Sequence, residues 1–134
     1  MTPDRIQWIV FDLGDVIVRL NRGYRPPAML QASPAARALL EDYFRDNFLP
    51  GKTEFSLNER FQLGQVSRAE FLRRIMDALD GAVSEDRIVR EFAGILAGVD
   101  EAVVAIVAAL KSRCRLACLT NTHAIHWEYI LREY

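Results

Sequence analysis

Two aspartates follow a short apolar stretch near the start of the chain. Residues 8–11 are β-branched or aromatic, and they lead directly into Asp12, Gly14 and Asp15. Such a stretch is typical of a strand that is buried on both faces of a parallel sheet. A carboxylate at the end of that strand can attack a phosphoryl group, and water can then hydrolyse the aspartyl-phosphate. We therefore take Asp12 as the first candidate for chemistry.

A second apolar stretch, RLACLT, ends at Thr120 and is followed by Asn121. Both residues precede a predicted helix, so a hydroxyl and free backbone N–H groups are available there to bind a phosphate. Ligands of open α/β sheets bind at the carboxyl ends of the strands. If the two strands are neighbours, Asp12 and Thr120 therefore face one crevice. Two anions that meet there need a cation, and Mg²⁺ held by a carboxylate, a carbonyl of the following turn and waters is the usual one.

The sequence between the two strands has helical periodicity. The predicted helices begin at Ser33 and run toward Phe48, span Leu57–Leu63, run from Ser67 to Gly81 and from Ser84 to Gly98, span Asp100–Leu110, and occupy Ala124–Tyr134. Capping residues and glycines mark their ends. The aromatic residues of this region are expected to form the core of the helical lid: Tyr43, Phe44, Phe71 and Phe92. The order strand, helical insert, helix, strand, helix predicts an open parallel α/β sheet with a mostly helical lid after the first strand.

Composition excludes several classes of protein. The 134 residues are 51% hydrophobic and carry a formal net charge of -1, which predicts one globular core and no electrostatic attraction to nucleic acid or a membrane surface. The apolar runs are too short to span a bilayer, and the N-terminus does not resemble a secretion signal, so we expect a cytoplasmic protein. Cys114 and Cys118 are expected to be small buried hydrophobes, and His123 and His126 to lie in the first turn of a surface helix.

The two motifs resemble those of the haloacid dehalogenase (HAD) superfamily of aspartate-nucleophile hydrolases. WIVFDLGDV resembles the superfamily's first motif, an apolar strand that ends in D-x-D-G-[TV], and LACLTNT resembles the second, a strand that ends in Ser or Thr. The match is closest to the branch with D-L-G-[NG]-V and S-N-T-x-x-x-H, similar to bacterial α-glucose-1-phosphatase-like sugar phosphatases. GQVSRAEF resembles the lid segment of that branch.

The resemblance implies a fold and an activity. It implies a HAD-like Rossmannoid parallel sheet, incomplete in this chain, that residues 1–20 and 99–134 form, with a helical cap that residues 21–98 form. The implied activity is Mg²⁺-dependent hydrolysis of a small phosphorylated metabolite, with a sugar phosphate as one guess.

The resemblance also implies roles for particular residues. Asp12 would be the nucleophile and a Mg²⁺ ligand, and Gly14 would offer its backbone carbonyl to the metal. Thr120 and Asn121 would bind the phosphate. The candidates for touching a substrate are His126, which stands where the branch has a histidine, and Arg22, which enters the lid near the mouth of the site.

The departures from the family pattern concern catalysis. Gly14 stands where most phosphatases of the superfamily carry the general acid and base. Asp15 could substitute in part, or it could be a turn residue that bonds its own loop. The expected lysine and acidic pair are missing after Thr120, where only Glu128 and Glu133 are acidic. We therefore expect an N-terminal part of a longer gene product, or a truncated, cleaved or swapped form, and an inactive chain when taken alone.

An alternative from another class stays open at this point. A non-catalytic HAD-like binding or regulatory module would also lack the general acid, the lysine and the acidic pair. A homodimer is a further arrangement that the sequence leaves open.

Overall fold

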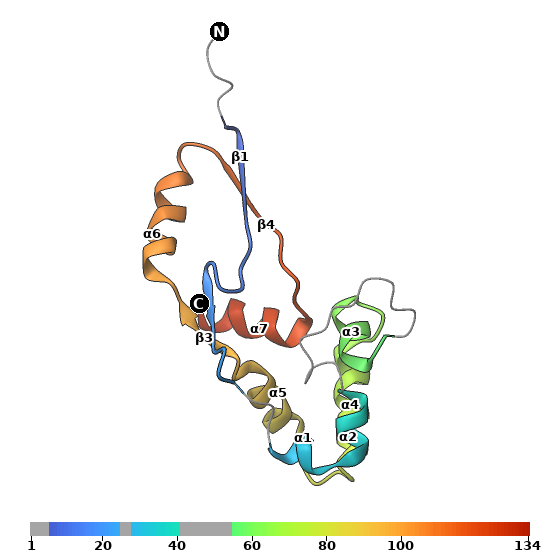
Figure 1. Ribbon diagram of the computed structural model, residues 1–134. Coiled ribbons are helices and arrows are strands. Elements are labelled where there is room, and N and C mark those ends of the chain that lie inside the picture. The colour runs from blue at the N-terminus through green and yellow to red at the C-terminus, as the bar shows by residue number, and fades with distance from the viewer. Residues whose placement is uncertain (1–5, 25–27, 41–54) are drawn as a thin grey trace. The chain divides into compact units, whose positions relative to one another are not determined.

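The computed structural model describes residues 6–24, 28–40 and 55–134 (Figure 1). Within these ranges the elements, in chain order, are β1 (Trp8–Phe11), β2 (Val18–Leu20), α1 (Ala28–Ala32), α2 (Pro34–Leu39), α3 (Leu57–Gln62), α4 (Arg68–Ala78), α5 (Glu85–Ala93), β3 (Leu96–Val99), α6 (Glu101–Leu110), β4 (Arg115–Cys118) and α7 (Ala124–Glu133). The expected α/β class is confirmed.

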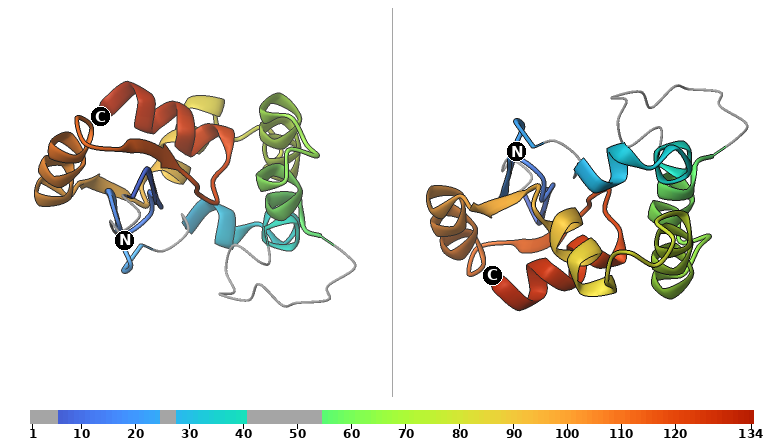
Figure 2. Two further views of the ribbon diagram at one scale, coloured as in Figure 1. Left: turned by 90° about the horizontal axis from the view of Figure 1, so that it is seen from above. Right: turned by 90° about the horizontal axis from the view of Figure 1, so that it is seen from below.

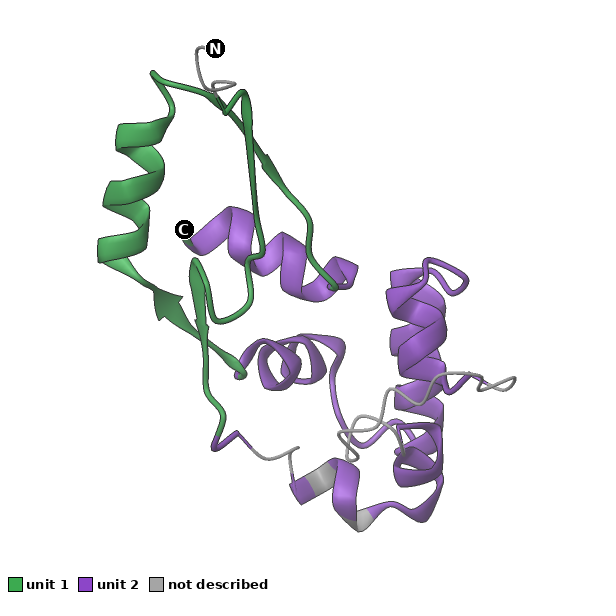
Figure 3. Ribbon diagram, turned by 45° about the horizontal axis from the view of Figure 1, so that its top comes forward, with its two compact units in different colours: residues 1–22, 95–121, 134 green, residues 23–94, 122–133 purple. Residues whose placement is uncertain are grey.

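The chain divides into two compact units, which Figure 3 shows in different colours. Unit 1 consists of Met1–Arg22, Ile95–Asn121 and Tyr134, and it holds the strands and α6. Unit 2 consists of Gly23–Gly94 and Thr122–Glu133, and it holds the other helices. Within unit 2, α7 contacts α5.

In unit 1, β1 and β4 form a parallel pair (Figure 1). The register runs from Trp8 opposite Arg115 to Phe11 opposite Cys118. Beyond the last pair, the Leu119 N–H donates to the Phe11 carbonyl at 2.9 Å. Parallel strands leave a sheet at the same edge, so the segments that follow β1 and β4 begin side by side.

A second pair of strands in unit 1 was not predicted. β2 and β3 pair antiparallel, with Val18 opposite Val99 and Leu20 opposite Leu96. The predicted helix over these last residues was wrong: α5 ends at Ala93, and Leu96–Val99 is a strand. Pairing with a distant segment that buries Val18 to 2% exposure overrides the local helical pattern here.

Two apolar side chains on β1 are exposed, which corrects the expectation of strands buried on both faces. Trp8 is 53% and Val10 is 58% exposed, and no residue of α6 is buried. Cys118 is exposed and Cys114 is half-buried, so neither is the buried hydrophobe that we expected. Among the described residues each strand pairs with one other strand, so neither sheet is wider than two strands.

Unit 2 is built around α4, which contacts α2, α3 and α5; Figure 2 shows α2 and α3 alongside it. Phe71 is fully buried, as predicted, and its ring stacks on Phe61 with 4.2 Å between centroids. The Phe92 ring, also predicted to be core, meets Phe71 edge-on at 5.3 Å. The predicted core residues Tyr43 and Phe44 lie outside the described ranges.

Two helix starts of unit 2 carry the predicted cap bonds, whereas the Ser84 side chain makes no cap bond at the start of α5. The Ser33 hydroxyl accepts the Ala36 N–H at 3.2 Å, and the Ser67 hydroxyl accepts the Glu70 N–H at the same distance. α3 carries a complete capping box that we had not predicted, formed by Ser56 and Glu59. Each cap satisfies backbone donors that a helix cannot pair internally, and thereby places the apolar stripe that follows it.

Candidate functional site

Asp12 is the first residue after β1, and it is exposed. Its Oδ1 accepts the N–H of Leu13 at 2.6 Å, which orients the carboxylate toward the turn. The Leu13 carbonyl in turn accepts the N–H groups of residues 16, 17 and 18 at 2.8 to 3.2 Å, so the chain reverses tightly. A Cβ on Gly14 would lie 3.3 Å from Leu20 Cδ1, so glycine lets the turn pack closely against β2.

Thr120 and Asn121 follow β4 at the same edge of the strand pair. Thr120 is half-buried and Asn121 is exposed. The bond from Leu119 N–H to the Phe11 carbonyl joins the residues directly before Thr120 and Asp12. Burial, and after it the Asp12 carboxylate, raise the pKa of the Cys118 thiol, which indicates that the charge of Asp12 lies near the end of β4. The structure thus brings the carboxyl ends of β1 and β4 together, as expected.

Asp15 and Arg22 are bonded within the same loop. Asp15 has a positive φ of 54°, a conformation that Asp tolerates better than most residues. Its Oδ1 accepts the Leu20 N–H at 2.9 Å, and its Oδ2 forms an ion pair with the Arg22 guanidinium. This is the turn role that we had left open for Asp15. It also gives Arg22, expected near a substrate, an intramolecular partner.

The histidines lie in the packed interior of unit 2, which corrects their expected place on a surface helix. His123 is only 4% exposed, and its ring stacks on Phe61 with 4.8 Å between centroids. Nε2 of His126 lies 2.9 Å from the Phe92 carbonyl. The aromatic residues that contact the His123 ring lie on α3, α4 and α5, which are distant from it in the sequence. The residues next to the histidines in the sequence therefore do not predict that the rings are buried.

The donors near Asp12 fit Mg²⁺ in kind. Mg²⁺ binds oxygen ligands, keeps several waters and usually takes one or two carboxylates together with phosphate oxygens. The Asp12 carboxylate and the Gly14 carbonyl could supply two such oxygens. Across the described ranges, no three His, Cys, Asp or Glu side chains gather in a way that could hold a metal ion. The described residues therefore supply only part of the oxygen ligands that such a site needs.

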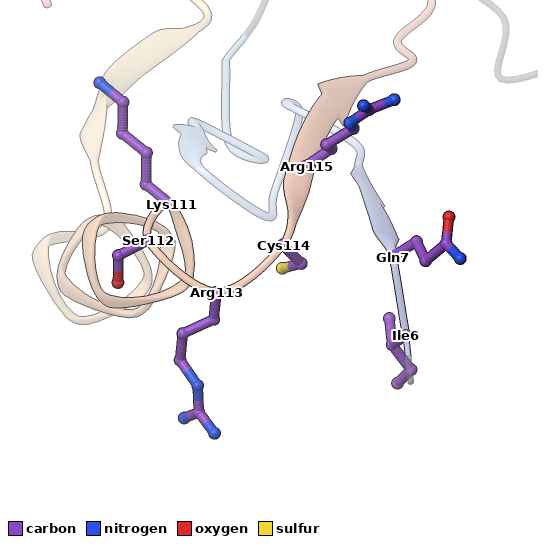
Figure 4. A pocket seen from close by; sticks show the side chains of 7 residues that line it. All are labelled: Ile6, Gln7, Lys111, Ser112, Arg113, Cys114 and Arg115. Atoms are coloured by element: carbon purple, nitrogen blue, oxygen red, sulfur yellow. The ribbon is translucent and has the colours of Figure 1, made fainter. Parts of the chain in front are cut away.

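A pocket of about 480 Å³ lies at the opposite end of the β1–β4 pair (Figure 4). It is lined by Ile6, Gln7, Lys111, Ser112, Arg113, Cys114 and Arg115. The three cationic side chains point in different directions in Figure 4, so they do not converge on one anion. None of the predicted site residues lines this pocket.

No protein-family model matches the sequence, and no curated protein sequence matches it. Solved structures do. A HAD family enzyme from Bacteroides thetaiotaomicron, in complex with magnesium and inorganic phosphate, matches with a TM-score of 0.74 and 20% sequence identity over 96% of this chain and 59% of that one. A variant of that enzyme with one aspartate replaced by alanine, again with magnesium and phosphate, gives the same values.

A predicted HAD-like family hydrolase from Porphyromonas gingivalis matches with a TM-score of 0.67 and 24% identity, over 95% of this chain and 55% of that one. The chain therefore has the HAD-like α/β fold, and it spans less than two thirds of the length of these structures. Within the described ranges, no helix has both the length and the apolar character that crossing a bilayer requires.

Proposed function

We propose that this chain provides the nucleophile and part of the phosphate site of a HAD-like, Mg²⁺-dependent phosphatase that acts on a small phosphorylated metabolite. The observation that carries the proposal is the parallel pairing of β1 with β4, which starts the Asp12 and Thr120 segments side by side. The magnesium and phosphate bound to the Bacteroides enzyme of the same fold support it.

The proposed reaction has two steps. A carboxylate oxygen of Asp12 attacks the phosphorus, the bond from phosphorus to the leaving oxygen breaks, and that oxygen keeps the electron pair and takes up a proton from solvent water. Water then attacks the aspartyl-phosphate, which releases inorganic phosphate and restores the carboxylate. The Thr120 hydroxyl and the Asn121 N–H would donate to the phosphoryl oxygens. Bound Mg²⁺ would supply the positive charge that lets the two anions meet.

The finer assignments belong to the same proposal. We propose that residues 1–20 and 99–134 form the catalytic core and residues 21–98 the cap, that a sugar phosphate is the substrate, and that the enzyme works in the cytoplasm. His126 would act on substrate or cap only if it left the Phe92 carbonyl that it contacts at 2.9 Å.

A non-catalytic binding module is the second candidate. The observation that favours it is the bonding of Asp15 to the Leu20 N–H and to Arg22. Gly14 occupies the usual place of the general acid, and the neighbouring Asp15 is already bonded within its own loop. Asp15 is therefore not free to protonate a leaving group. A full-length protein that is inert toward a broad panel of phosphorylated metabolites, yet binds one partner tightly, would favour this candidate.

The enzyme proposal is tested by aryl phosphate hydrolysis in the natively expressed protein. We expect phosphate release that requires Mg²⁺ and that falls by about a thousandfold or more in Asp12→Asn, because the amide cannot form the aspartyl-phosphate. The 134-residue chain assayed alone is expected to be inactive.

A matched control is Asp77→Asn, which neutralises an exposed acid on α4 that pairs with Arg73. This control should retain wild-type activity. Undiminished phosphate release by Asp12→Asn would refute the assigned nucleophile.

A further inference from the structure

Asp15 joins the turn after β1 to the strand that follows it. Its Oδ1 accepts the Leu20 N–H, five residues further along the chain, at 2.9 Å. Its own N–H donates to the Val18 carbonyl at 2.8 Å. Val18 and Leu20 are the first and last residues of β2. The side chain and the backbone of Asp15 therefore hold both ends of this strand against the turn.

The backbone at position 15 restricts which residue can do this. The φ of Asp15 is 54°, in the left-handed region that most residue types avoid. Asp and Asn enter this region more readily than most other residues that have a side chain, and glycine enters it freely but offers no side-chain acceptor. The position therefore combines a conformation that favours Asp, Asn or Gly with a bond that needs an oxygen.

The strand that supports the turn is itself fixed at both ends. Before β2, the Asp100 N–H donates to the Ile17 carbonyl at 2.8 Å, and after it the Asn21 N–H donates to the Ile95 carbonyl at 2.8 Å. Between these bonds β2 pairs with β3. All of these residues belong to unit 1. Within that unit, β2 is therefore a firm support for the turn.

The turn that Asp15 closes begins at Asp12. The Leu13 N–H donates to Asp12 Oδ1 at 2.6 Å. The Leu13 carbonyl accepts the N–H groups of residues 16–18. Leu13 thus bonds the candidate nucleophile on one side and the closed turn on the other. The shape of the turn therefore determines where the Asp12 carboxylate lies within unit 1.

The oxygen of Asp15 matters more for this closure than its charge. The Arg22 side chain that pairs with Asp15 is 83% exposed, and exposed ion pairs contribute little because water and salt screen them. The Leu20 N–H, in contrast, is a backbone donor held in place by β2. A side-chain oxygen of either Asp or Asn can accept it.

We propose that Asp15 is a positioning residue for Asp12, and that it acts through the oxygen that accepts the Leu20 N–H rather than as an acid. The role of Asp12 as the nucleophile rests on the proposed function. The ordering of the turn by Asp15 does not, and it can be measured separately.

Two substitutions separate the oxygen of Asp15 from its charge. Asp15→Asn keeps an acceptor and removes the charge. Asp15→Gly removes both, and glycine adopts the positive φ without strain. The matched control is Asp80→Gly, which makes the same change at a φ of 53° in unit 2. The readouts in the natively expressed protein are amide hydrogen exchange at residues 16–18, the Kd for inorganic phosphate with Mg²⁺, and the pH dependence of aryl phosphate hydrolysis.

We expect Asp15→Gly to speed exchange at residues 16–18 and to weaken phosphate binding, each by about five- to tenfold, the size typical of one lost hydrogen bond. Asp15→Asn should retain most of the protection, the affinity and the activity, with an unchanged shape of the pH–rate profile. Asp80→Gly should change neither the exchange nor the affinity.

Two results would overturn the proposal. The first is an Asp15→Gly protein whose exchange and affinity move no more than those of Asp80→Gly, which is what a merely structural role predicts. The second is an Asp15→Asn protein as inactive as Asp15→Gly, with the alkaline limb of its pH–rate profile changed. That result would make Asp15 the general acid.

The remaining outcomes also decide. If wild-type protein does not bind phosphate while Asp15→Gly still speeds exchange in the turn, the proposed function fails and the ordering role stands. If Asp15→Gly does not fold, a coupling through the hydrogen bond, between the Leu20 nitrogen and the Asp15 carboxyl carbon of the wild type, gives the answer. Its presence supports the proposal, and its absence overturns it.

Discussion

The burial of His123 couples the stability of unit 2 to pH. The pKa of its imidazole falls to about 3 in the folded chain, from an ordinary value of 6.5. Between these two pH values the unfolded chain binds a proton that the folded chain does not, so acid favours unfolding. The pKa of His126 is lowered in the same direction by burial, although its hydrogen bond with the Phe92 carbonyl opposes the shift.

We therefore predict that the free energy of unfolding falls as the pH drops from about 6.5 toward 3. His123 alone should contribute up to about 1.4 kcal/mol per pH unit in that window. Urea unfolding at several pH values measures this slope. His123→Phe should show a shallower slope, because one of the titrating groups is gone. Equal slopes in the two proteins would show that His123 does not titrate on unfolding.

At the residue scale, the sequence allows the prediction of where Asp12 and Thr120 lie, because each ends an apolar run and the ends of parallel strands meet. It does not predict the surroundings of His123 or Asp15. A histidine before a helix has the same local pattern whether its ring is exposed or stacked on Phe61. The pairing of Asp15 with Arg22 likewise depends on the shape of a turn that closes only in three dimensions.

At the scale of elements, the end of α5 depends on a close contact. A Cβ on Gly94 would lie 2.9 Å from Tyr24 Cε2 and 3.2 Å from the Glu91 carbonyl oxygen. The Tyr24 hydroxyl donates to that same carbonyl, and burial, followed by the charge of Glu91, raises the pKa of Tyr24 to about 12. Glycine at position 94 thus lets the Tyr24 ring lie directly on the end of the helix.

We predict that Gly94→Ala destabilises the protein by about 1–3 kcal/mol, the usual cost of overpacking. The cost should shrink in a Tyr24→Ala background, where the nearest ring atoms are absent and only the approach to the Glu91 carbonyl remains. Urea unfolding of the four proteins in this double-mutant cycle measures the coupling. An equal cost of Gly94→Ala in both backgrounds would show that the Tyr24 contact does not constrain this position.

Helix starts were predictable because a cap is a local signal, carried by residues three apart such as Ser33 and Ala36 or Ser67 and Glu70. The β2–β3 pair could not be predicted, because it joins segments more than seventy residues apart and its strands are short. Leu96 fits the apolar stripe of the preceding helix as well as it fits a strand. Only the partner strand decides between the two.

At the scale of the whole molecule, the sequence motifs predicted the HAD-like fold, and the solved structures confirm it. The contacts of α7 could not be predicted in the same way. Its apolar positions and His126 suit packing against α5 as well as against a sheet. Ile125 on α7 is 1% exposed and belongs to the hydrophobic core of unit 2. This contact makes α7 part of unit 2.

The central claim is that Asp12 and Thr120 lie around one phosphoryl group. It is tested most directly by titrating ¹⁵N-labelled protein with inorganic phosphate in the presence of Mg²⁺. We predict that the amides of residues 13–14 and of residues 120–121 shift along one binding curve with a single Kd. Gly64, which belongs to unit 2, serves as the control and should not move. Shifts confined to one of the two segments, or two segments that follow different curves, would contradict the account.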